Sequence, residues 1–200
     1  MTGLQPDYPV RSSRLLLRPI EMADVPSLVG YRSRPDVCRF VPFEPMDEEV
    51  IESRLRGAWS RRTLDAAGQM LMLGIELRAG GRLIGDMMLA CGSERHANGE
   101  IGYVLDPAYG GRGFATEAAH RVLHLAFDDL GLHRVVARVV EGNDASVRVA
   151  RRLGMRQEGH LLENEWFKGR WIDELSFALL DREWRASHDA ATAAVTGCPD

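Results

Sequence analysis

Lysine is nearly absent from this sequence of 200 residues, in which Lys168 is the only one and arginine supplies the other fixed positive charges. The formal net charge is −4 at pH 7, and the arginines form no continuous basic stripe. Proteins that bind nucleic acid through its phosphates concentrate positive charge on one face. We therefore expect no nucleic-acid partner.

Cysteine is also scarce. Cys38, Cys91 and Cys198 lie far apart, and no Cys-x-x-Cys pair occurs. Zinc sites and disulfide frameworks need closer or paired cysteines, so the pattern indicates reduced thiols in a cytoplasmic protein. No segment approaches the roughly 18 to 20 apolar residues of a membrane span. Residues 1–10 carry Asp7 and two prolines where a signal peptide would be apolar, so we expect no membrane association.

A metal-binding motif is absent as well. His120 and His124 stand four residues apart, a spacing that suits zinc ligands on a helix. Arg121, however, occupies the position of the glutamate in the His-Glu-x-x-His pattern. We expect no metal site.

No repeat, low-complexity block or linker divides the chain, so we expect a single domain over residues 14–185. Residues 1–13 are polar and contain prolines, and we expect them to form a flexible segment. Residues 186–200 are small and polar, which is typical of a disordered tail.

Hydrophobic periodicity and turn residues predict the order of the elements. The predicted strands cover 14–18, 70–77, 83–90, 100–105, 134–140, 157–164 and 170–180. The predicted helices begin near Asp24, Asp47, Ala115 and Asn143. The order β-α-α-β-β-β-α-β-α-β-β indicates an α/β (mixed α+β) fold of about seven strands and about four helices, too irregular for a doubly wound sheet.

The most distinctive segment is Gly110–Glu117 (GGRGFATE), which joins a predicted strand to a long helix. Glycines allow a sharp turn with exposed N–H groups, and the start of a helix adds unpaired donors and a positive dipole end. This combination suits a phosphate or pyrophosphate. A nucleoside-triphosphate loop would need a lysine here, and a dinucleotide fingerprint would need glycine or alanine at Thr116, so both are excluded.

Residues Gly110–Ala115 resemble the Gln/Arg-x-x-Gly-x-Gly/Ala signature with which GNAT acyltransferases bind the pyrophosphate of CoA. Gly113 and Ala115 match its last two fixed positions, and Gly110 replaces the first. Further segments are similar to the RimJ/RimL-like branch, which includes ribosomal-protein N-terminal acetyltransferases: Arg14–Pro19 (RLLLRP), Glu100–Leu105 (EIGYVL), Ala115–Ala118 (ATEA), Asn143–Ser146 (NDAS), Leu153–Met155 (LGM) and Gly169–Asp173 (GRWID). The resemblance covers about 13–184 and implies a mostly antiparallel GNAT sheet and an acyl-CoA-dependent N-acyltransferase.

The resemblance also implies where acetyl-CoA, or another short acyl-CoA, is bound. Pantetheine would pair like an added strand with the backbone of Val104 and Leu105, where that strand splays from its neighbour. The other implied contacts are Gly110, Gly111, Arg112, Gly113, Phe114, Ala115 and Thr116 at the pyrophosphate, and Asn143 and Ser146.

Acylation of an amine needs a neutral amine, a donor for the oxyanion and a proton for the departing thiolate. Many relatives use a tyrosine as the acid, but no tyrosine follows Tyr109. The resemblance implies Ser146, three residues after Asn143, although these two residues also fit a helix cap and a first-turn serine. Glu100 is our candidate for the base, with Glu163, Glu165 or water alone as alternatives.

The acceptor is expected to be a primary amine of a small molecule or a peptide N-terminus. Phe43, Glu163 and Trp166 are predicted to contact it, because the first helices and the last hairpin flank the thioester in this fold. The sequence leaves the oligomeric state open, with a homodimer as one option. The alternative function is a non-catalytic acyl-CoA-binding sensor or interaction module, which would have no need of both Asn143 and Ser146.

Overall fold

Eight strands form one sheet in the computed structural model, which describes residues 3–187. Their order is β1-β2-β3-β4-β5-β6-β8-β7, and β5 and β6 are the only parallel neighbours among the described strands. The strands are β1 (Val10–Arg11), β2 (Leu15–Pro19), β3 (Met70–Leu77), β4 (Leu83–Ser93), β5 (Asn98–Leu105), β6 (Arg134–Val140), β7 (Arg156–Phe167) and β8 (Arg170–Leu180).

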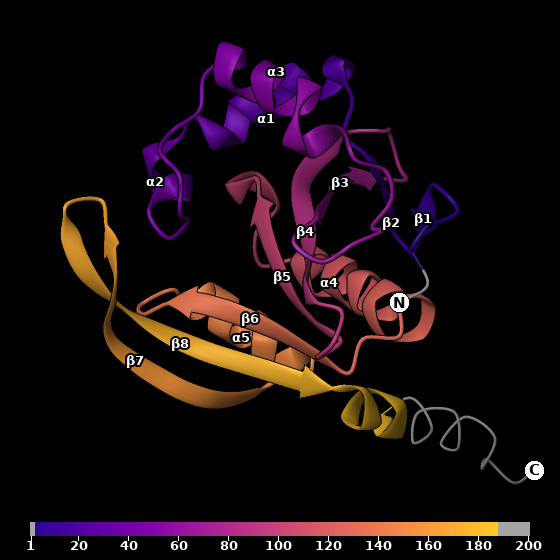
Figure 1. Ribbon diagram of the computed structural model, residues 1–200. Helices are drawn as coiled ribbons and strands as arrows, with labels where there is room; N and C mark the ends of the chain where they lie inside the picture. The colour runs from indigo at the N-terminus through magenta and orange to yellow at the C-terminus, as the bar shows by residue number, and fades with distance from the viewer. Residues whose placement is uncertain (1–2, 188–200) are drawn as a thin grey trace, which may run out of the picture.

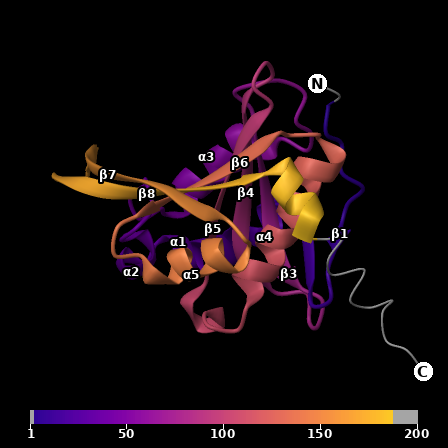
Figure 2. The ribbon, with the colours of Figure 1, turned by 90° about the horizontal axis from the view of Figure 1, so that it is seen from below.

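Helices cover both faces of the sheet (Figures 1 and 2). One face carries α1 (Val25–Arg32), α2 (Pro35–Cys38) and α3 (Glu48–Arg56), with the 3-10 turns Met22–Asp24 and Ala58–Ser60. The other carries α4 (Phe114–His124), which continues into a π-helical turn (Leu125–Asp129), and α5 (Asp144–Arg152). We call these the α1–α3 face and the α4–α5 face. A third 3-10 turn, Pro107–Tyr109, precedes the glycine loop.

Successive side chains of a strand point to opposite faces, and this alternation separates two hydrophobic clusters. Met72 and Val104 pack with α1 and α3, whereas Leu73 and Ile101 pack with α4. The sheet therefore holds both helical layers in place and leaves its own central strands between them.

The mixed, mostly antiparallel fold predicted from the sequence is confirmed, with its elements in the predicted order. The structure adds two short elements that periodicity could not reveal. Strand β1 has two residues and α2 has four, lengths too short to repeat a pattern. None of the described helices is both long and apolar enough to cross a membrane.

The segment before residue 14 differs from its prediction. Residues 3–13 were expected to be flexible, but β1 pairs with β2, and Leu4 bridges to Leu64. Leu4 and Val10 are buried in the large hydrophobic cluster, which explains why this segment is fixed despite its polar composition. Of the predicted tail, residues 188–200 lie outside the described residues.

The last hairpin, β7–β8, extends beyond the body of the sheet and curves toward α2 (Figure 1). Lys168 stands in its turn and donates a hydrogen bond of 2.6 Å from Nζ to the carbonyl oxygen of Cys38, at the end of α2. The same Nζ lies 3.8 Å from a carboxylate oxygen of Glu44. One side chain thus connects the tip of the hairpin to the α1–α3 face.

Candidate active site

Strands β5 and β6 run in parallel but separate after three residue pairs (Figure 1). The last pair joins Glu100 to Val136, yet β5 continues to Leu105 and β6 to Val140. Beyond that pair, the backbone N–H and C=O groups of β5 and β6 that face each other form no hydrogen bonds between the two strands. Unpaired N–H and C=O groups at a strand edge can bind an extended ligand.

A cavity of about 480 Å³ lies at this gap and is lined from both faces of the sheet. Tyr103 and Val139 border it on the α4–α5 face, while Gly102, Val104 and Arg138 border it on the other. A ligand in the gap is therefore accessible from both sides of the sheet.

Ser146 and Asn143 meet at the start of α5, beside the gap. The side-chain oxygen of Asn143 accepts a hydrogen bond of 3.2 Å from the backbone N–H of Ser146 and caps the helix. The amide nitrogen of Asn143 makes no hydrogen bond within residues 3–187. Its cap role and a ligand role are thus compatible, because they use different atoms.

Tyr103 completes this group and was not predicted from the sequence. Its hydroxyl lies 3.1 Å from Ser146 Oγ and donates a hydrogen bond to it. Burial raises the pKa of Tyr103, against the lowering effect of that bond, so the phenol keeps its proton at neutral pH. Ser146 is left with its own O–H to donate into the cavity, which both residues line. Tyr103 lies on β5, before Tyr109 in the chain, whereas a tyrosine acid was expected on a later helix.

The glycine loop has the backbone that a phosphate cradle needs. Gly111 and Gly113 have φ of 72° and 80°, in the left-handed region where other residues are strained. Gly113 is also the residue before α4, so the loop leads directly to the first N–H groups of that helix, which have no partner within the helix. Thr116 Oγ1, in the first turn, is buried without a hydrogen-bond partner in the described part of the chain. An anionic ligand at this position would supply one, and the residues fit the pyrophosphate of CoA.

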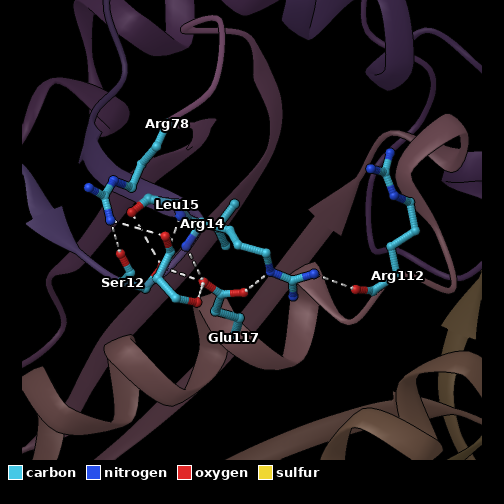
Figure 3. Close-up of polar contacts among 7 residues, drawn as sticks. Ser12, Arg14, Leu15, Arg78, Arg112 and Glu117 are labelled. Atoms are coloured by element: carbon cyan, nitrogen blue, oxygen red, sulfur yellow. Dashed lines mark hydrogen bonds and ion pairs between the residues drawn. The ribbon is translucent and has the colours of Figure 1, made fainter.

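Glu117 fixes this loop to the N-terminal strands (Figure 3). Its carboxylate accepts hydrogen bonds from the hydroxyls of Ser12 (2.7 Å) and Ser13 (2.9 Å) and from Arg14, through the backbone N–H (2.8 Å) and Nε (2.6 Å). Burial alone raises the pKa of Glu117, but these bonds outweigh it and hold the pKa at about 2. Arg14 Nη1 also donates to the carbonyl oxygen of Arg112, within the glycine loop.

On the α1–α3 face, the cavity ends at a buried ion pair. Asp86 accepts hydrogen bonds from Arg32 Nε (2.9 Å), Arg32 Nη2 (2.5 Å) and the hydroxyl of Tyr31 (2.6 Å). The Arg32 guanidinium also lies 4.6 Å from the ring centre of Phe43 and 4.7 Å from that of Trp59. Phe43, predicted as an acceptor contact, lines the cavity and is held there by this cation–π contact.

The predicted hairpin residues are divided by the pleat of β7. Glu165 and Phe167 line the cavity. Trp166 points to the opposite side, where it is 63% exposed and packs edge-on against Trp171. Glu163 is also outside the cavity lining, and its backbone N–H donates to Asp173 Oδ1 at 2.8 Å.

Two further carboxylates border the cavity. Glu100, the sequence-based candidate for the base, lies 3.8 Å from Arg138 Nε. Glu174 on β8 also lines the cavity, and sequence reasoning missed it because no functional motif singles out this residue.

A central parallel pair that splays beside a glycine loop and a capped helix defines an acyl-CoA-dependent transferase fold. The sequence matches the acetyltransferase (GNAT) domain family over residues 14–156, more than half of the chain, and the chain belongs to this family. It is an N-acetyltransferase that takes its acyl group from acetyl-CoA.

Individual relatives agree with this assignment. The uncharacterized N-acetyltransferase YnaD of Bacillus subtilis is 30% identical over 178 residues, which cover 88% of this chain and 98% of that protein. Spermidine N(1)-acetyltransferase of Vibrio cholerae is 25% identical over 86% of this chain and 96% of that protein.

Solved structures share the fold. A GNAT-family acetyltransferase from Bacillus anthracis superposes with a TM-score of 0.78, at 29% identity, over 87% of this chain and 99% of that one. A spermidine N-acetyltransferase from Vibrio cholerae, solved with CoA and spermine, has a TM-score of 0.75 at 23% identity over 87% and 99% of the two chains.

Proposed function

We propose that this enzyme acetylates a primary amine that enters from the α1–α3 face while acetyl-CoA lies in the β5–β6 gap. The observation that carries the proposal is the cavity that crosses the sheet at this gap. Such a cavity lets the two substrates meet in one ternary complex. The amine then attacks the thioester directly, with no acyl-enzyme intermediate.

For the donor, we assign pantetheine to the unpaired backbone of Val104 and Leu105 and to the free amide nitrogen of Asn143. The pyrophosphate is assigned to the loop and first helical turn, namely Gly110, Gly111, Arg112, Gly113, Phe114, Ala115 and Thr116. Backbone N–H groups at a helix start favour an anion, and the left-handed glycines supply the approach. No metal takes part in this scheme.

For the chemistry, we assign Ser146 as the acid that protonates the CoA thiolate. Tyr103 supports this role, because its hydrogen bond to Ser146 Oγ leaves the serine proton directed elsewhere. Proton removal from the amine is assigned to a carboxylate of the opposite wall, for which Glu100 is the sequence-based candidate. Glu100 already has a cationic neighbour in Arg138, at 3.8 Å, which competes with an acceptor ammonium for this carboxylate.

For the acceptor, we propose a cationic primary amine, either a polyamine-like small molecule or a peptide N-terminus as in the RimJ/RimL-like branch. Glu100, Glu165 and Glu174 give one wall of the cavity an acidic character that suits an ammonium group. Phe43 would pack against the carbon chain beside the amine. Glu163 and Trp166 lie along the hairpin outside the cavity, where they would contact the projecting part of a longer acceptor.

Two further proposals concern the cellular location of the enzyme and its oligomeric state. We place the enzyme in the cytoplasm, in keeping with the reduced, buried thiol of Cys38. We also propose a homodimer, for which Leu161 and Leu162, exposed on β7, provide a surface.

The test is thiol release from acetyl-CoA with spermidine and with a short peptide bearing a free N-terminus. Wild-type enzyme should turn over at least one of them, and Ser146→Ala should lower kcat by about 100-fold with an unchanged Kd for acetyl-CoA. Ser176→Ala is the control, because it changes a serine on β8 that lies outside the cavity lining, and it should keep full activity. Tight CoA binding without turnover of either amine would favour the sensor, and an unchanged kcat would dismiss Ser146 as the acid.

A further inference from the structure

Four charged side chains are buried among the described residues: Asp24, Arg32, Asp86 and Glu174. Three of them form ion pairs. Asp24 receives two bonds from Arg18, and Arg32 pairs with Asp86. Glu174 is 6% exposed, yet its carboxylate forms no hydrogen bond or ion pair within residues 3–187. The side chain as a whole is buried, but it lines the cavity and its oxygens are not among the buried atoms without a partner, so they are accessible to a ligand in the cavity.

The position of Glu174 directs it into the active-site cavity. It pairs with Val140 on β6, four residues beyond the last β5–β6 pair, and therefore lies where the gap is already open. Strand alternation puts its side chain on the same face as Arg138 and Glu100, which is the α1–α3 face from which the acceptor enters. Arg138 from β6, Glu165 from β7 and Glu100 from β5 are the charged groups that act on it.

We propose that Glu174, rather than Glu100, is the base that takes the proton from the acceptor ammonium. This inference rests on the proposed function and names one further residue of the same site. One proton passes from the ammonium nitrogen to a Glu174 oxygen, and the neutral amine attacks the thioester carbon. The C–N bond forms, the C–S bond breaks, and the proton that the nitrogen then carries passes by way of Ser146 to the thiolate. Glu174 afterwards releases its proton to water.

The electrostatics agree with that role. Burial raises the pKa of Glu174, Arg138 lowers it, and the charges of Glu165 and Glu100 raise it again. A carboxylate with a raised pKa accepts a proton more readily, which is what a base for an ammonium group needs. Glu100 already pairs with Arg138, and Glu165 is exposed, so neither shares the environment of Glu174.

The experiment compares three isosteric variants, Glu174→Gln, Glu100→Gln and Glu165→Gln, with spermidine and with a free-N-terminus peptide. Values of kcat/KM are measured from about pH 5 to 9, and Glu174→Gln should lower kcat about 100-fold and remove the acid limb of the profile. The other two variants should keep that limb. Unchanged thermal stability and acetyl-CoA affinity would show that Glu174→Gln is folded, and the loss of a buried charge without a bonded partner should not destabilise it.

Glu174→Asp provides a second variant, since it keeps the carboxylate and should retain the limb with reduced kcat. The role of Glu174 is overturned if the wild type is active and Glu174→Gln keeps the wild-type profile, or if Glu100→Gln is the variant that loses the limb. A wild type that transfers acetyl to neither amine would instead overturn the proposed function, so the two failures are distinguishable.

Discussion

The gap is built differently on its two faces. On the α4–α5 face it is bordered by the backbone of β5 and by the capped start of α5, and the glycine loop follows β5 in the chain; each of these depends on a few consecutive residues. On the α1–α3 face it is bordered by side chains that come from distant segments, such as Arg32, Asp86 and Glu174. The α4–α5 side of the gap therefore suits one constant ligand. The side chains on the α1–α3 side can be exchanged to suit different acceptors.

The largest effect should come from the α1–α3 face. Replacement of Asp86 by alanine leaves the buried Arg32 without its counter-ion, and we expect a loss of about 3–5 kcal/mol in the free energy of unfolding. Urea denaturation measures this loss. Asp36→Ala is the control, because its partner Arg34 forms an exposed pair and no measurable loss is expected. Equal effects of the two variants would contradict the account of Asp86.

On the α4–α5 face, Gly113→Val should weaken acetyl-CoA binding by about 1,000-fold, or about 4 kcal/mol. The left-handed φ of Gly113 is strained for valine, and the loop would shift from the start of α4. Gly154→Val is the matched control, since Gly154 has φ of 77° but lies after α5. It should lose stability while it keeps its affinity for acetyl-CoA in titration calorimetry. If Gly113→Val and Gly154→Val lost the same affinity for acetyl-CoA, the assignment of the pyrophosphate to this loop would be wrong.

A smaller effect, dependent on pH, is expected at Glu117. Glu117→Gln should cost about 2 kcal/mol in unfolding free energy at pH 7, because the bonds from Ser12, Ser13 and Arg14 lose their charged acceptor. The pKa of Glu117 is about 2 in the folded protein against an ordinary 4.5, so the folded state binds fewer protons. Its contribution is complete above pH 4.5 and disappears as the pH falls through about 2. Denaturation at several pH values should show the difference between variant and wild type closing toward low pH.

The smallest effect should be at Trp166. Because this side chain is exposed and outside the cavity, Trp166→Ala should leave KM for spermidine unchanged. A peptide acceptor, which projects along the hairpin, should lose about 1 kcal/mol of binding, or roughly fivefold in KM. Steady-state kinetics with both acceptors makes the comparison. An equal rise in KM for both acceptors would indicate that Trp166 contacts the amine rather than the projecting part of the peptide.

The difference between the faces also explains what could be predicted from the sequence. The order of elements and the glycine loop depend on local periodicity and on residues such as Gly113, so the fold and the place of the loop could be predicted. Tyr103 was missed because its approach to Ser146 needs two strands to separate and a helix to start beside them.

The positions of the other site residues depend on strand pairing and on the pleat, neither of which could be predicted from the sequence. Glu174 has no functional motif of its own, and only the β6–β8 register reveals that it faces the cavity. Trp166 and Glu165 are neighbours, yet the pleat of β7 sends them to opposite sides. Leu4 was assigned to a flexible segment because its burial depends on Leu64, which lies far along the chain.

The contact of Lys168 with Cys38 has a practical consequence for an enzyme that acetylates amines. Lys168 carries the only side-chain amine in the chain, and its nitrogen is engaged by a carbonyl oxygen at 2.6 Å. The only lysine of the chain is thus held in a contact between the hairpin tip and α2, with 25% of its side chain exposed. The extent to which an amine-reactive reagent modifies Lys168, located by peptide mass mapping, would therefore report how readily the Lys168–Cys38 contact opens.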